Sequence, residues 1–70
     1  MIKQKYKNGT RIIVNENCVI DFIIGERGVI SDMRDDGLYR ILLNNRDFYL
    51  YDTSFDLDIA EIIKENFSLL

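Results

Sequence analysis

Turn-forming residues recur through the first fifty positions of the chain and leave room only for short strands between them. The turn sequences are Asn8-Gly9, Asn15-Glu16-Asn17, Gly25-Glu26-Arg27-Gly28, Asp35-Asp36-Gly37 and Asn44-Asn45. The intervening segments are rich in Ile, Val, Leu and Tyr, which favour extended backbone. They predict strands over residues 10–15, 29–33, 38–44 and 47–51, with 19–24 as a further strand or as the arm of a long loop.

Alternation of apolar and polar residues is clearest in the third quarter of the chain. Tyr39, Ile41 and Leu43 are two residues apart and share one face of a strand. Asp36-Gly37 and Asn44-Asn45 accept the positive φ of tight hairpin turns. Short turns between neighbouring strands give antiparallel pairing, so we expect a mainly β fold, a small five-stranded antiparallel barrel that hides its sheet edges.

The hydrophobic period changes at the C-terminal end. Apolar residues fall at helical spacing, and they are Phe55, Ile59, Ile62, Ile63, Phe67 and Leu70. This spacing predicts an α-helix over residues 54–67, capped by Thr53 or Ser54. We expect its apolar stripe to close one end of the barrel or to pack on its side.

The length of 70 residues allows one hydrophobic core, so we expect a single domain over residues 1–70. Residues 8–52 form the barrel, and 1–7, with Lys3, Lys5 and Lys7, form a basic tail or an edge strand blunted by lysine. The longest apolar run, 18–24, is interrupted by Asp21 and is too short to span a membrane. With no secretory signal visible, we expect a cytoplasmic protein.

Glycine and apolar spacing give the chain a family resemblance over residues 8–51. The matching stretches are Asn8-Gly-Thr-Arg-Ile-Ile-Val14, Ile24-Gly-Glu-Arg-Gly-Val-Ile30, Leu38-Tyr-Arg-Ile-Leu-Leu43 and Tyr49-Leu-Tyr51. They resemble an SH3-like barrel of the KOW and translation-protein type. The resemblance implies a binding module, since members of this superfold bind RNA, ribosomes, polymerase, peptides or other proteins.

Catalytic chemistry has little support in the residues. The chain has no histidine, which removes Ser-His and Cys-His pairs and histidine metal ligands, and Cys18 is its one cysteine. The acidic pairs Asp35-Asp36 and Asp56-x-Asp58 fit a hairpin turn and a helix start. A calcium loop starting at Asp52 has Leu57 and Ile63 where glycine and glutamate are needed. We therefore expect no enzyme, no metal site and no cofactor.

The aromatic residues near the end of the barrel predict a protein-binding patch. Tyr49 and Tyr51, with Arg40 and Leu42 on the adjacent strand, make an amphipathic surface of the composition found in interfaces. The alternative, which we favour from sequence, is that the C-terminal helix covers these residues. A homodimer through the helix, with Phe67, Leu69 and Leu70 at its end, is a further expectation.

Charge favours a protein partner over nucleic acid. Residues 12–70 hold five basic and twelve acidic groups, and the whole chain has a net charge of −3. The leading hypothesis is a non-enzymatic protein-binding module. Its Ile-, Asn- and Lys-rich sequence looks like small accessory proteins of phages or mobile elements. If that resemblance holds, inhibition of a host protein complex is a more specific form of the hypothesis. The alternative is an RNA- or ribosome-binding module that uses Lys3, Lys5, Lys7, Arg11 and Arg27 as phosphate contacts.

Overall fold

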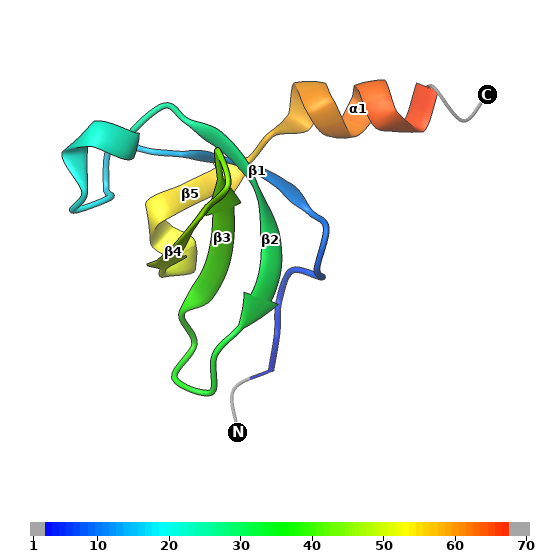
Figure 1. Ribbon diagram of the computed structural model, residues 1–70. Coiled ribbons are helices and arrows are strands. Elements are labelled where there is room, and N and C mark those ends of the chain that lie inside the picture. Colours follow the sequence, from blue (N-terminus) through cyan, green and yellow to red (C-terminus); the bar gives the residue numbers. More distant parts are fainter. Residues whose placement is uncertain (1–2, 68–70) are drawn as a thin grey trace.

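Five antiparallel strands form one sheet in the order β4-β3-β2-β1-β5 (Figure 1). The computed structural model describes residues 3–67. Its elements are β1 (Arg11–Val14), η1 (Asp21–Ile23), β2 (Arg27–Met33), β3 (Tyr39–Leu43), β4 (Arg46–Leu50), η2 (Asp52–Ser54), β5 (Phe55–Leu57) and α1 (Ile59–Phe67), where η1 and η2 are 3-10 turns. The predicted mainly β class, with five antiparallel strands and a C-terminal helix, is confirmed. Closure of the sheet into a barrel stays a prediction, because β4 and β5 are the two ends of the hydrogen-bonded order.

Both predicted hairpins are present. Residues 34–38 connect β2 to β3, with Gly37 at φ +91°, and Asn44-Asn45 connects β3 to β4. Asn44 and Asn45 both have positive φ, at 48° and 67°, which matches the right-handed twist of the flanking strands. The turn sets the register, so that Leu43 lies opposite Arg46 and Ile41 opposite Phe48.

The identity of the fifth strand differs from the prediction. Of the two alternatives predicted for residues 19–24, the loop is confirmed and the strand is wrong, because they belong to the long loop between β1 and β2, which contains η1. The fifth strand is β5, from the segment expected to start the helix, and it pairs with β1 so that Phe55 lies opposite Val14. A strand of three residues is too short to show alternation, and its apolar residues also fit the helical spacing that follows.

The helix therefore begins at Ile59 rather than at residue 54, and neither Thr53 nor Ser54 caps it. Asp58 does so instead. Its Oδ1 accepts a hydrogen bond from the backbone N–H of Glu61, at 3.4 Å, and its backbone oxygen accepts one from Ile62. Asp58 thus occupies the N-cap position and satisfies a free N–H of the first turn.

The core lies on the inner face of the sheet and under the long loop. Its buried side chains are Ile12, Val14, Cys18, Ile23, Ile30, Tyr39, Ile41, Leu43, Leu50 and Phe55. Tyr39, Ile41 and Leu43 share this face, as their alternation predicts. Gly28 allows the close approach of β2 to β3, because a Cβ there would lie 2.6 Å from the carbonyl oxygen of Leu42 and against the side chain of Leu43.

The N-terminal segment contains no strand within residues 3–8, so the edge-strand expectation is wrong. Tyr6 packs on the core instead, with its ring 5.9 Å from the rings of both Tyr39 and Phe55. The backbone N–H groups of Lys5 and Tyr6 donate hydrogen bonds to the phenol oxygen of Tyr39. The segment is therefore held against the core, while Lys3, Lys5 and Lys7 are exposed.

Candidate protein-interaction surface

The structure brings the predicted patch residues to one region of the surface. Along β3, Tyr39, Ile41 and Leu43 point into the core, so Arg40 and Leu42 point outward. Tyr49 on β4 lies directly opposite Arg40, and Tyr51 follows two residues later, just after β4. Tyr49 is 46% exposed and Tyr51 57% exposed. We call Arg40, Leu42, Tyr49 and Tyr51 the Tyr49 face.

Two arginine contacts order the side chains of this face. Nη2 of Arg40 lies 2.7 Å from Oδ2 of Asp47 in an ion pair, and this hydrogen bond raises the pKa of the Arg40 guanidinium above its ordinary value. Arg34 lies over the ring of Tyr49, with 5.2 Å between its guanidinium carbon and the ring centre, and also pairs with Asp36. A cation–π contact of this kind stabilises the position of an exposed ring by about 0.5–1 kcal/mol.

The expectation that the C-terminal helix covers these tyrosines is wrong. The helix α1 packs against β1, which is separated from β4 by β3 and β2 in the sheet. From there α1 extends away from the sheet (Figure 1). Tyr49 and Tyr51 are left exposed. Among the described residues, Ile59 and Ile63 of the helix are also exposed, while the homodimer expected through the helix rests partly on Leu69 and Leu70, which lie outside the described residues.

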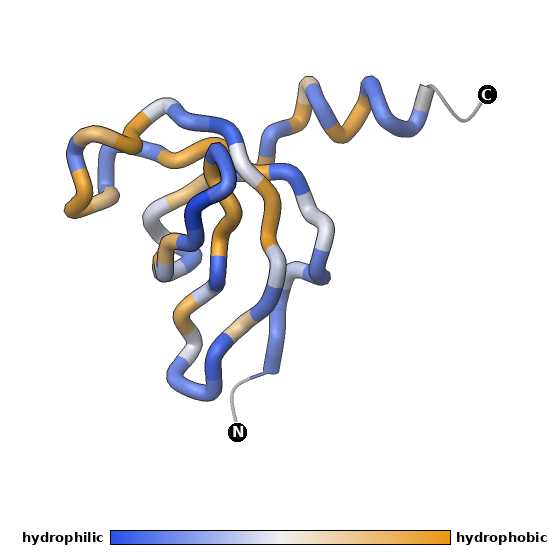
Figure 2. Tube along the Cα trace, viewed as in Figure 1, coloured by the Kyte–Doolittle hydropathy of each residue, from blue (hydrophilic) through white to orange (hydrophobic). Residues whose placement is uncertain are grey.

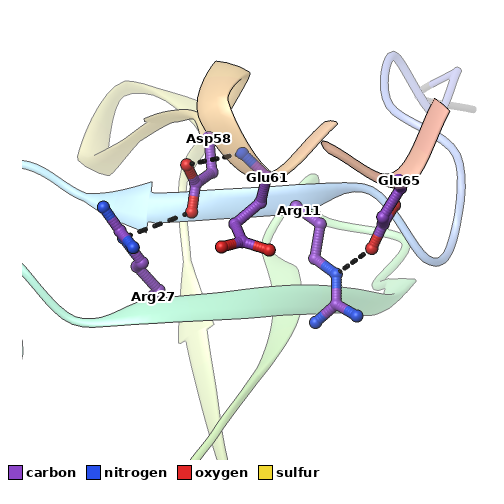
Figure 3. Close-up of polar contacts among 5 residues, drawn as sticks. All are labelled: Arg11, Arg27, Asp58, Glu61 and Glu65. Atoms are coloured by element: carbon purple, nitrogen blue, oxygen red, sulfur yellow. Dashed lines mark hydrogen bonds and ion pairs between the residues drawn. The ribbon is translucent and has the colours of Figure 1, made fainter. Parts of the chain in front are cut away.

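Two of the five basic residues predicted to contact RNA are engaged with carboxylates. Arg11 on β1 pairs with Glu65, and Arg27 on β2 pairs with Asp58 at 3.4 Å (Figure 3). The hydrogen bond with Glu65 and the nearby charges of Glu61 and Asp58 raise the pKa of Arg11. An anion would have to compete with this acidic side of the helix, whereas Lys3, Lys5 and Lys7 have exposed side chains. RNA or ribosome binding stays a prediction.

Asp58 is the one buried charged residue of the described part of the chain, with 5% of its surface exposed. Its Oδ1 caps the helix, while its Oδ2 faces Arg27 but has no hydrogen-bond donor in satisfactory geometry. The contact is thus an ion pair without a well-formed hydrogen bond. Burial of a carboxylate is tolerated when an opposite charge lies close, which gives Arg27 a structural role.

Sequence reasoning missed a second exposed apolar surface, on the loop between β1 and β2. Val19 is 91% exposed and Phe22 is 74% exposed, whereas Cys18 and Ile23 of the same loop are buried. Figure 2 shows this loop as a largely apolar projection at one side of the sheet. No periodicity in the segment separates its buried residues from its exposed ones, so the sequence carries no signal for this surface.

Within residues 3–67 no group of three or more cysteine, aspartate or glutamate side chains is arranged to hold a metal ion. In the same range, no helix has the length and apolar character required to cross a membrane. Cys18 is a free cysteine buried in the core.

The fold and the Tyr49 face define a small mainly β protein with an exposed aromatic surface. No protein-family model matches the sequence, and no curated protein or solved structure matches it either.

Proposed function

We propose that the protein is a non-enzymatic binding module that recognises another protein through the Tyr49 face. The observation that carries the proposal is the direct opposition of Arg40 and Tyr49 on neighbouring strands, with Leu42 beside them and Tyr49 exposed. Tyrosine and arginine are, with tryptophan, the residues enriched among those that dominate binding energy at interfaces. The lack of histidine in the sequence also supports a role in binding rather than catalysis.

The arrangement of the face favours binding because its side chains are already ordered. Arg34 holds the ring of Tyr49 from one side, and Asp47 holds Arg40. Binding of a partner therefore costs less conformational entropy than it would with free side chains. A module of this size acts by occupying a surface on a larger protein, and inhibition of a host complex by a mobile-element protein is one form of that action.

The experiment first identifies the partner and then tests whether residues of the Tyr49 face are needed to bind it. Immobilised protein retains partners from cells of its source organism, which mass spectrometry identifies, and the purified partner is titrated against a Tyr49→Ala, Tyr51→Ala double variant. We expect at least a tenfold loss of affinity, the equivalent of about 1.4 kcal/mol. Lys64→Ala, an exposed substitution on α1, serves as the control that keeps wild-type affinity.

Circular dichroism shows whether the double variant keeps its fold. A folded double variant that binds the partner as tightly as the wild type would reject the Tyr49 face as the binding surface.

A further inference from the structure

A pocket of about 240 Å³ lies between the β1–β2 loop and the β3–β4 hairpin, away from the Tyr49 face. Its apolar lining comes from the buried residues Ile23 and Leu43 and from Phe22 and Phe48, whose rings meet edge to face at 6.2 Å. Glu26, Asn44 and Arg46 supply its polar lining. The pocket therefore combines an apolar interior with polar groups, as ligand sites do.

The loop that forms one wall is fixed rather than loosely attached. Cys18 and Ile23 are buried, and the backbone N–H of Gly25 donates to the oxygen of Val14 at 2.8 Å. The N–H of Glu26 donates to the oxygen of Ile23 at 3.0 Å. Phe22 thus remains 74% exposed on a segment whose backbone is anchored on both sides of it. A preformed wall lowers the conformational-entropy cost of ligand binding.

Arg46 sets the chemistry of the ligand. Four of the five arginines pair with a carboxylate, and they are Arg11, Arg27, Arg34 and Arg40. Within residues 3–67, Arg46 is the one arginine with no carboxylate in ion-pair range, although Glu26 lines the same pocket. Asn44 donates a hydrogen bond to Glu26 at 3.3 Å and so engages that carboxylate. The guanidinium of Arg46 is therefore available to pair with an anionic group of a ligand.

We propose that this pocket binds an apolar side chain of an acidic segment in a partner protein, and that Arg46 pairs with a carboxylate beside that side chain. The inference rests on the proposed protein-binding function and assigns a second contact surface and a partner chemistry to it. A bidentate arginine–carboxylate pair supplies orientation, and burial of the apolar side chain against the rings of Phe22 and Phe48 supplies affinity.

The test uses blocked five-residue peptides and two-dimensional NMR of the isotope-labelled protein. The first peptide is Gly-Asp-Leu-Glu-Gly, the second replaces both acids with lysine, and the third replaces leucine with glycine. We expect the first to cause saturable shifts at Phe22, Asn44 and Arg46. The other two should bind at least fivefold more weakly, a difference of about 1 kcal/mol.

Charge reversal identifies the role of the arginine. We expect Arg46→Glu to lose the acidic peptide and to gain the lysine peptide, whereas Lys64→Glu, the same charge change on α1, should alter neither affinity. Phe22→Ala should weaken binding of the acidic peptide about fivefold, as truncation of an aromatic anchor does. All three substituted side chains are exposed, so the variants keep the fold, which their spectra verify.

Three results of the peptide titrations would overturn the inference: no saturable shift with the acidic peptide, equal binding of the lysine peptide, or peptide shifts confined to the Tyr49 face. The last would leave the proposed function intact. Shifts at the pocket that depend on protein concentration alone would assign it to a second copy of this chain and also overturn the inference.

Discussion

The backbone N–H of Lys5 donates a 2.8 Å hydrogen bond to the phenol oxygen of Tyr39, a residue 34 positions further along the chain. The same oxygen accepts the N–H of Tyr6 at 3.1 Å. The buried side chain of Tyr39 therefore binds the backbone of the N-terminal segment directly.

Removal of this oxygen by Tyr39→Phe should loosen the segment while leaving the ring packing intact. We expect the free energy of unfolding to fall by about 0.5–1.5 kcal/mol, because two N–H donors lose their acceptor. Amide hydrogen exchange at Lys5 and Tyr6 should accelerate. Tyr51→Phe, at an exposed position, serves as the control with unchanged stability in urea unfolding, and unchanged exchange in Tyr39→Phe would contradict the prediction.

The pairing of Arg27 with Asp58 predicts a coupled pair of substitutions. Arg27→Ala leaves a buried carboxylate without its countercharge and should cost about 1–3 kcal/mol of stability. Asp58→Asn keeps an N-cap acceptor but removes the charge. In that background we expect Arg27→Ala to cost much less, which urea unfolding of the four proteins measures.

The exposed pair of Arg34 and Asp36 provides the comparison for this cycle. Arg34→Ala should change stability by less than about 1 kcal/mol, as surface ion pairs do. If Arg27→Ala costs the same in the wild-type background as in the Asp58→Asn background, the two side chains do not interact energetically.

The close packing around Gly28 predicts that any side chain at this position lowers the stability of the fold. Gly28→Ala should destabilise the protein by about 1–3 kcal/mol, because its Cβ would meet the backbone oxygen of Leu42 and force β2 and β3 apart. Gly28→Ser should cost more, since it adds a further atom. Thermal unfolding measures both, and a fully stable Gly28→Ala protein would show that the strands can separate without penalty.

The outward position of Ile63 predicts that it contributes little to the stability of the single chain. We expect Ile63→Gln to change the free energy of unfolding by no more than about 0.5 kcal/mol. Ile41→Ala, in the core, should cost about 2–5 kcal/mol.

Sedimentation of the same variant tests the predicted homodimer. Self-association through α1 requires the wild type to sediment as a dimer at high concentration and Ile63→Gln to sediment as a monomer. A wild type that stays monomeric throughout would reject that use of the helix.

Features of the fold could be predicted from the sequence where the preferences of neighbouring residues agree with the contacts of the folded protein. Asn44-Asn45 adopts the positive φ that its residues favour, and alternation from Tyr39 to Leu43 identifies the buried face of β3. The opposition of Arg40 and Tyr49 follows from that turn and that alternation. These elements depend on interactions close in sequence.

The remaining differences come from contacts distant in sequence. The short strand β5 exists because it pairs with β1, more than forty residues earlier, and nothing within Phe55–Leu57 indicates that partner. Arg11 pairs with Glu65 of α1 and Arg27 pairs with Asp58 at its start, while Ile59 and Ile63 are exposed. Hydrophobic spacing alone would have turned its apolar stripe inward.

The ring cluster of Tyr6, Tyr39 and Phe55 joins the N-terminal segment to β3 and β5. During translation, Tyr6 and Tyr39 are synthesised before Phe55, the residue that completes this cluster. The nascent polypeptide can finish its core only after Phe55 has left the exit tunnel. Products of premature termination before that codon would therefore display unprotected apolar surface and become substrates for cellular proteases.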